Sequence, residues 1–388
     1  MGISTQHVYG RQRKFFANPE SPLGTFAKPE ATDAAKIIKA DFNINVERPD
    51  RTDSRATRSL LERVTGKKTV GWNVEAEVIP SGTAGTPPDL HPLYLGALPA
   101  YSNSPGTSDT YAPSASQTIG GNTMCQHFPE TATDPNGYME TIWGASVEEM
   151  SISVKTGESA KVKFSGVAMG FAATGNTTLN GAMVTSATMV VATATGRNIS
   201  LNSVVKVAAL DNTGAGYRVT VATARPSFTI ESAISADTAA TVYPFTPTET
   251  TAGIPLIGIA GGFTVDETTI PFQSFDITVK NNYKPLADEG LVQIHSDIIP
   301  GYRTVTGSVS FRARKDFIVE LGKREDFGAR ALICTIGNVA GKRLVLTTTY
   351  AEFNFAAASL PEAEEGVITL PFVCLGSSGE DEISLAFT

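Results

Sequence analysis

The chain contains 388 residues, of which 41% are hydrophobic and only 18% are charged. This length suits two domains, or one large domain that carries an insertion, and the hydrophobic content is sufficient for a folded core. The formal net charge of −8 argues against a general nucleic-acid binder, which needs a basic face for the phosphate backbone. We find neither a secretory signal nor an apolar run of the roughly 18 residues that a membrane-spanning helix requires. The three cysteines are widely spaced and odd in number, which predicts reduced thiols in a cytoplasmic protein.

The first half of the chain is predicted to form strands and loops with little helix. Apolar and polar residues alternate at 72–78, as is typical of a half-buried antiparallel strand. Residues 88–98 predict a short helix that opens at a proline or an aspartate. Residues 101–137 are rich in Ser, Thr, Pro and Gly and predict a long surface loop. Alternation then returns at 150–154 and 162–164.

A neutral segment in the middle of the chain is predicted to be an inserted domain. Its basic and acidic residues balance, and short β-type runs are separated by turn residues. These runs are 204–207, 217–221, 227–230 and 241–245. We therefore divide the chain into a discontinuous β-domain, 1–175 and 248–388, and an inserted small β-domain, 176–247. We expect the insertion to lie on the outer surface and to fold independently, with 170–175 and 246–253 as linkers.

The last third of the chain again alternates, at 275–279 and 305–311. Residues 316–327 place apolar side chains loosely on one side of a helix, and Gly328 could end it. The predicted fold class is therefore mainly β, with antiparallel strands, one flanking α-helix and the inserted small β-domain.

Residues that could carry chemistry are few and scattered. Cys125 and His127 have the residue types of metal ligands, but no second pair has suitable spacing, so we interpret both as loop residues. Carboxylates gather at 148–149, 362–365 and 380–382, where an acid–base pair for glycoside chemistry or a solvated turn would both fit. We predict no enzyme, and no catalytic, cofactor or metal site.

One segment, 48–68, has a dense mixture of both charges. It can be a solvated loop, or a docking arm whose charges match those of a neighbouring subunit and set its register. The residues that would dock are Arg51, Asp53, Arg55, Arg58 and Arg63.

Short motifs rich in Gly, Thr and Arg follow one another in a particular order. In the first half they are the charged segment 47–68, the strand 70–79 and the run 80–89 (PSGTAGTPPD); in the second half they are 301–307 (GYRTVTG), 337–342 (GNVAGK) and 379–382 (GEDE). In this order the chain resembles the major tail tube proteins of long-tailed, siphovirus-like bacteriophages. The resemblance covers roughly 40–100, 138–165 and 263–388.

The resemblance implies a β-sandwich or barrel of the tail tube type, flanked by a helix. It also implies that six copies form a ring and that rings stack into a tube, through which DNA passes into the host without specific binding. The implied partners are other copies of the chain, a tape-measure protein, and tail-tip and terminator proteins, with no membrane. The location would be the virion tail, assembled in the host cytoplasm.

Within that interpretation the docking arm stacks rings, and the polar side of two strands lines the lumen. The lumen candidates are Glu75, Glu77 and Glu149. An acidic wall would repel the DNA backbone during passage. The alternatives are another phage structural protein, such as a head decoration protein or an Ig-like adhesin, and a glycan-degrading enzyme.

Overall fold

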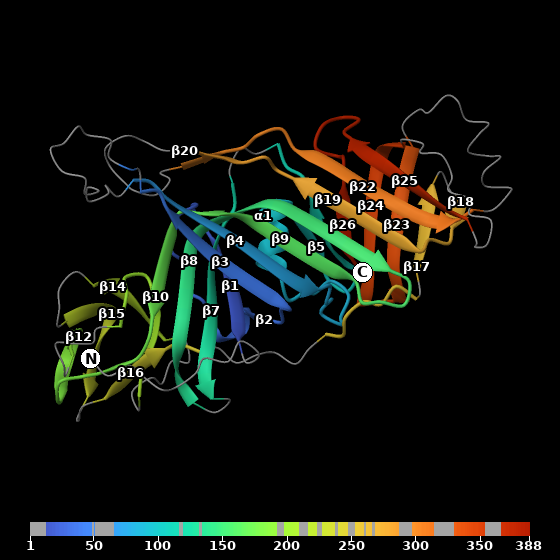
Figure 1. The fold of residues 1–388 in the computed structure, drawn as a ribbon. Helices are drawn as coiled ribbons and strands as arrows, with labels where there is room; N and C mark the ends of the chain where they lie inside the picture. Colours follow the sequence, from blue (N-terminus) through green and yellow to red (C-terminus); the bar gives the residue numbers. More distant parts are fainter. Residues whose placement is uncertain are drawn as a thin grey trace.

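A computed structural model describes the chain in fifteen stretches, which are 13–48, 50, 66–115, 119–131, 134–191, 198–208, 216–222, 227–236, 240–246, 253–259, 261–265, 268–286, 297–313, 330–353 and 366–388. Within them the protein is mainly antiparallel β-sheet (Figure 1). The described helices are α1 (His91–Ala97) and one turn of 3₁₀ helix, η2 (Ala31–Asp33). None of the described helices is long and apolar enough to cross a membrane. The short helix expected at 88–98 is thus confirmed, whereas the helix expected at 316–327 lies outside the described residues.

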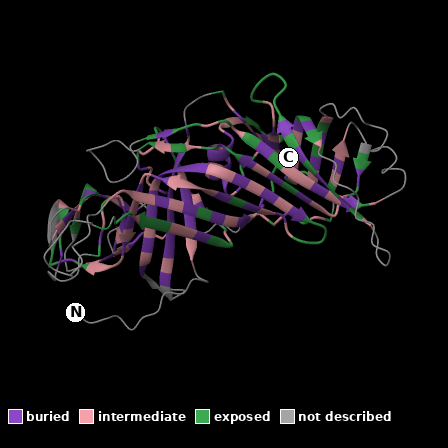
Figure 2. Cartoon of the chain, turned by 45° about the horizontal axis from the view of Figure 1, so that its top comes forward, coloured by how far each residue is buried: buried purple, intermediate pink, exposed green. Residues whose placement is uncertain are grey.

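Eight strands form a continuous antiparallel sheet, which we call the central sheet. In spatial order they are β3 (Lys39–Val46), β4 (Lys68–Glu77), β9 (Lys161–Ala168), the second half of β8 (Asp134–Lys155), β19 (Ser274–Lys280), β22 (Thr304–Arg312), β25 (Val367–Leu375) and the end of β24 (Lys342–Phe353). All five alternating segments predicted from the sequence are strands of this sheet. Their apolar residues point to one side and are buried, for example Val74, Phe164 and Ile277. Buried residues alternate with more exposed ones along the strands (Figure 2).

A second layer of strands covers the apolar side of the central sheet. Strand β24 belongs to both layers and so connects them. Strand β24 pairs with β23 (Arg330–Val339) from Lys342 to Ala351, and with β26 (Ser384–Phe387) from Leu344 to Thr347. Beyond them lie β17 (Gly261–Val265) and β18 (Thr268–Ile270) on one side, and β6 (Ser108–Ala112) and β5 (Ala100–Ser104) on the other. The layers meet where Phe263 and Phe275 place their ring centroids 6.0 Å apart. Tyr94 of α1 packs against Phe164 and Phe387, each at 5.2 Å.

A smaller branch of sheet extends from the first half of β8. There β8 pairs with β7 (Gly121–Thr131) and β10 (Gly170–Thr174), and β7 pairs with β1 (Lys14–Glu20), which pairs with β2 (Ala34–Ala35). The prediction of a surface loop at 101–137 is therefore wrong. This region holds β5, β6 and β7, and Met124 and Cys125 are fully buried. Threonine favours strands as well as loops, and here tertiary burial decided between them.

Six short strands form a separate antiparallel sheet, the small sheet. Its order is β11 (Thr177–Thr178), β16 (Thr241–Pro244), β13 (Val204–Val207), β14 (Tyr217–Val221), β15 (Ser227–Ala236) and β12 (Met183–Val190). All four short runs predicted in this region are strands. The small sheet has an apolar cluster of its own, which includes Met189, Val219 and Phe228. A further two-stranded ribbon, β20 (Lys284–Leu286) with β21 (Asp297–Ile299), lies elsewhere in the chain.

A shared apolar cluster joins the small sheet to the branch around β8. Its buried members are Phe16, Phe26, Cys125, Met139, Val204 and Phe245. At its rim, Lys28 and Glu231 form an ion pair at 2.6 Å, and Arg218 lies over the ring of Phe26 at 4.7 Å. The flank 170–175, which we expected to be a linker, is instead strand β10. The small sheet therefore packs directly on the rest of the molecule.

Candidate functional site

Five neighbouring strands of the central sheet, β3, β4, β9, β8 and β19, carry charged and polar side chains on the side away from the core. Cross-strand register brings these residues together, with Glu75 opposite Lys163 and Glu149 opposite Lys280. We call this surface the polar face. It comprises Lys39, Asp41, Asn73, Glu75, Glu77, Glu149, Ser151, Lys155, Lys161, Lys163, Ser165, Asp276 and Lys280.

A shallow groove of about 320 Å³ lies on the polar face. Side chains from four of the strands line it, namely Lys39, Asn73, Glu75, Glu149, Ser151, Lys163 and Ser165. The structure thus brings two of the three lumen candidates, Glu75 and Glu149, to one groove. Glu77 lies on the same face, opposite Lys161. That these residues line a lumen stays a prediction.

Lysines pair with the carboxylates of the polar face, so the surface is mixed in charge. The ion pairs are Lys39–Asp41 at 2.6 Å, Glu149–Lys280 at 3.1 Å and Glu75–Lys163 at 3.7 Å. Partial burial raises the pKa of the Asp276 carboxyl, and the positive charge of Lys155 partly offsets that rise. The acidic wall that we expected is therefore not what this face presents. Paired charges of both signs give a well-hydrated surface that neither attracts nor strongly repels a polyanion.

The same side of the sheet changes character beyond β19. Across β22 it carries hydroxyl side chains, Thr304, Thr306, Ser308 and Ser310, and across β25 it carries the partly exposed Val367, Val373 and Leu375. Among the described strands beyond β19, the charged side chains on this side are Arg312 at the end of β22 and Glu352 of β24.

The predicted docking arm follows β3 and precedes β4, which form an antiparallel hairpin. Backbone hydrogen bonds continue the ladder past the strands, from Glu47 N–H to Lys67 O and from Gly66 N–H to Glu47 O. The five arm residues, Arg51, Asp53, Arg55, Arg58 and Arg63, lie outside the described residues, and their role stays a prediction. Their segment connects the far ends of the two hairpin strands.

Cys125 and His127, which we interpreted as loop residues, both lie in β7 and are completely buried. The Cys125 thiol donates to Thr141 Oγ1 at 3.3 Å, and burial raises the pKa of this thiol to about 12. Such a thiol is unreactive at neutral pH. Within the described stretches, no three His, Cys, Asp or Glu side chains are grouped closely enough to hold a metal ion.

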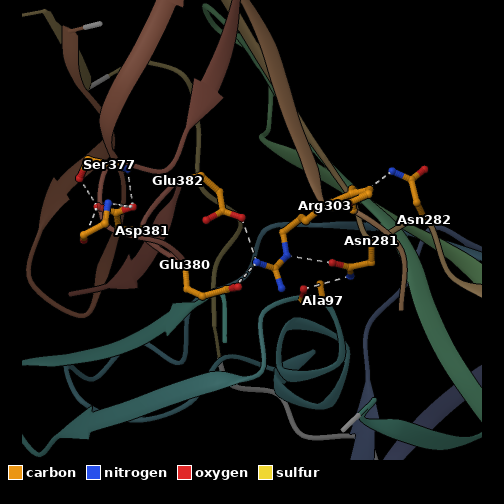
Figure 3. A network of polar contacts seen from close by, with 10 residues as sticks. Ala97, Asn281, Asn282, Arg303, Ser377, Glu380, Asp381 and Glu382 are labelled. Atoms are coloured by element: carbon orange, nitrogen blue, oxygen red, sulfur yellow. Dashed lines mark hydrogen bonds and ion pairs between the residues drawn. The ribbon is translucent and has the colours of Figure 1, made fainter. Parts of the chain in front are cut away.

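A partly buried network around Arg303 was not foreseen from the sequence (Figure 3). Its guanidinium donates to Glu380 Oε2 at 2.7 Å and to Glu382 Oε1 at 2.9 Å, while Nε donates to Asn281 Oδ1 at 3.1 Å. The Asn281 amide in turn donates to the carbonyl oxygens of Ala97, at 3.2 Å, and Val147, at 3.0 Å. Arg303 thereby connects the last loop of the chain to the end of α1 and to β8.

The surroundings of Arg303 favour its charged form. Burial disfavours the charged form, yet the hydrogen bonds that Arg303 donates to Glu380 and Glu382 raise the pKa of Arg303 above its ordinary value. Of the carboxylates at 380–382, Asp381 instead accepts from Ser377 and Ser378, and the Ser377 hydroxyl lowers its pKa. For the carboxylates at 380–382 we considered an acid–base pair and a solvated turn. The contacts fit the turn, because these carboxylates hold a loop in place.

The chain matches no protein-family model, and a search of curated proteins found no match to it.

Proposed function

We propose that the chain is a virion structural protein that assembles into the tail tube of a long-tailed bacteriophage. The observation that carries the proposal is the β3–β4 hairpin at the edge of the central sheet, whose strands are joined by the mixed-charge segment. A hairpin at a sheet edge that ends in dense charges of both signs suits repeated docking between identical subunits. The ordered motifs of the sequence resemblance support the same class of protein.

The polar face suits the wall of a conduit. Its lysines and carboxylates neutralise one another across neighbouring strands, as in the pairs Glu75–Lys163 and Glu149–Lys280. DNA that passed such a wall would find no row of unpaired lysines to hold its phosphates. The tape-measure, tail-tip and terminator proteins, the sixfold ring and the virion location belong to the same proposal.

Negative-stain microscopy of the purified chain tests the proposal. We expect stacked rings with a central hole, either spontaneously or on tail-initiation complexes. Discrete trimers on capsids would favour a decoration protein, and a chain that stays monomeric at high concentration in both settings would overturn the proposal.

Charge reversal in the arm tests the proposed role of the hairpin. Arg55→Glu with Arg58→Glu should abolish stacking while circular dichroism and the unfolding midpoint stay unchanged. The matched control reverses two exposed lysines elsewhere, Lys284→Glu with Lys342→Glu, and should assemble normally. Full-length tubes from the arm variant would show that the arm is not the docking element.

A further inference from the structure

The strands outside the small sheet repeat one arrangement twice. The strands β1, β2, β3, β4, β7, β8, β9 and β10 follow one another in the chain, and β17, β18, β19, β22, β23, β24, β25 and β26 follow in the same order. Every pairing within the first set recurs at the same place in the second; for example, β4 with β9 recurs as β22 with β25, and β7 with β8 as β23 with β24. We call the two sets the first unit, 14–174, and the second unit, 261–387.

The correspondence between the units extends to single positions. Val70 is the first fully buried residue of β4, and Val305 is the first fully buried residue of β22. Val70 pairs with Ile44 of β3, and Val305 pairs with Val279 of β19. Ile44 in the first unit is therefore the counterpart of Val279 in the second.

The two counterparts differ in what covers them. Val279 is 0% exposed, whereas Ile44 is 45% exposed. Strand β19 pairs on one edge with residues 149–155 of β8, which belong to the first unit. The corresponding edge of β3 is paired with no strand among those described. The chain thus holds a filled version and an empty version of the same sheet edge.

The empty edge carries backbone groups that can pair. Alternate residues of an antiparallel strand direct their N–H and C=O groups to the same side. Glu47 exchanges backbone hydrogen bonds with the residues just before β4, so its groups face β4. By this alternation Phe42, Ile44 and Val46 direct their N–H and C=O groups toward the empty edge. Such an edge invites pairing with another extended segment.

Arg13 limits the empty edge on one side. Its guanidinium donates from Nη1 to the carbonyl oxygen of Ala40 at 2.6 Å, and from Nη2 to that of Ile38 at 3.5 Å. These two carbonyl oxygens lie at and just before the start of β3. The part of the edge that remains open among the described residues is 42–46.

We propose that the free edge of β3 is an interface with a second copy of this chain, whose second unit pairs with it as β8 pairs with β19. A second copy fits this edge because the chain already forms the same junction between its own two units. The second unit of the neighbour faces the edge because β24 is the counterpart of β8. This contact joins different surfaces of two copies, so its repetition gives a closed ring or an open filament. The proposal holds for any such assembly and does not depend on the tail tube assignment.

Photo-cross-linking identifies the surface that meets the edge. The probe p-benzoylphenylalanine replaces Ile44, and a mixture of ¹⁵N-labelled and unlabelled chains is irradiated. We expect links between chains to the last tryptic peptide, 344–388, which holds β25, β26 and most of β24. The same probe at Val221, which is 44% exposed in the small sheet, is the matched control and should not label that peptide. Links only within one chain, or only to the first unit of another copy, would overturn the proposal.

A proline at the same position tests the backbone pairing. Ile44→Pro removes an N–H group that faces the empty edge, and it leaves the hydrogen bonds between β3 and β4 intact. Self-association measured by sedimentation velocity should weaken about tenfold or more, because at least one hydrogen bond of the interface is lost. Ile44→Val keeps the N–H group and should associate like the parent chain. Should the proline variant unfold, Ile44→Lys places a charge on the edge and should weaken association in the same way. Equal association of the parent and the variants, or a parent chain that stays monomeric at high concentration, would overturn the proposal.

Discussion

The central sheet and the small sheet differ in how far apart their strands lie in the sequence. In and around the central sheet, β4 pairs with β9 and β22 with β25, and β6 pairs with β26 near the other end of the chain. The small sheet takes all six of its strands from one stretch between β10 and β17. Local pairing can form early and alone, whereas the central sheet needs nearly the whole chain.

The shared cluster qualifies that contrast. Val204 and Phe245 of the small sheet's region pack against Phe16, Phe26 and Met139 of the branch around β8. A unit that is local in topology is thus coupled energetically to its host. The following predictions test how strong this coupling is.

Removing the small sheet should have the largest effect. Replacing 176–247 with a short Gly/Ser bridge uncovers Phe16 and Phe26, and each buried phenylalanine contributes about 1.5–3 kcal/mol. We expect a protein that aggregates, or that loses several degrees of thermal stability, as measured by calorimetry. Adding Phe26→Ser and Met139→Thr should restore solubility without the small sheet. A bridged chain as stable as the parent would show that the two units are independent, as the sequence alone suggested.

A single truncation in the shared cluster should have the next largest effect. Phe245→Ala removes a side chain that is 2% exposed, and such changes cost about 3–5 kcal/mol. Denaturant unfolding followed by the fluorescence of Trp143, which packs against the cluster, measures the loss. Leu201→Ala, at a position 46% exposed in the same region, is the matched control and should stay within about 0.5 kcal/mol.

The Cys125 thiol reports whether that loss is local or global. Its pKa of about 12 keeps it protonated in the closed protein, so alkylation at pH 8 requires the cluster to open. In Phe245→Ala we expect faster labelling of Cys125 than of Cys334 in the main core. Equal labelling rates at both cysteines would mean that the small sheet never opens alone.

The local pattern predicted β4, β8, β9, β19 and β22 of the central sheet and β13, β14, β15 and β16 of the small sheet, because such patterns are local signals. It did not mark β3, β24 or β25, nor β11 or β12. It located the strands at 72–78 and 241–245 equally well, although β4 pairs with the distant β9 and β16 pairs with strands of its own small sheet. It missed β6 and β7, where Ser, Thr and Asn interrupt the apolar pattern and burial comes from strands elsewhere in the chain. It also could not foresee that Arg303 meets Glu380, since ion pairs between distant segments leave no periodic trace.

Loss of the Arg303 network should have an intermediate effect confined to the main layers. Arg303→Met leaves Asn281 and Glu382 short of partners, and hydrogen bonds to charged groups contribute about 1.5–3 kcal/mol each. Because Glu380 is partly exposed, we expect a net loss of about 2 kcal/mol in denaturant unfolding. Lys280→Met, which removes the exposed pair with Glu149, is the control and should cost less than about 1 kcal/mol. Equal losses in the two variants would refute a structural role for the network.

The smallest effect is expected on the polar face. The Glu75–Lys163 pair spans 3.7 Å, with the two side chains 26% and 62% exposed, so water screens it. A double-mutant cycle with Glu75→Ala and Lys163→Ala should give a coupling energy below about 1 kcal/mol that shrinks further in 1 M salt. A coupling of several kcal/mol would mean that these charges hold the sheet together. A small coupling energy would mean that the pairing of these charges contributes little to stability. Their arrangement would then be explained by what passes or binds along the polar face.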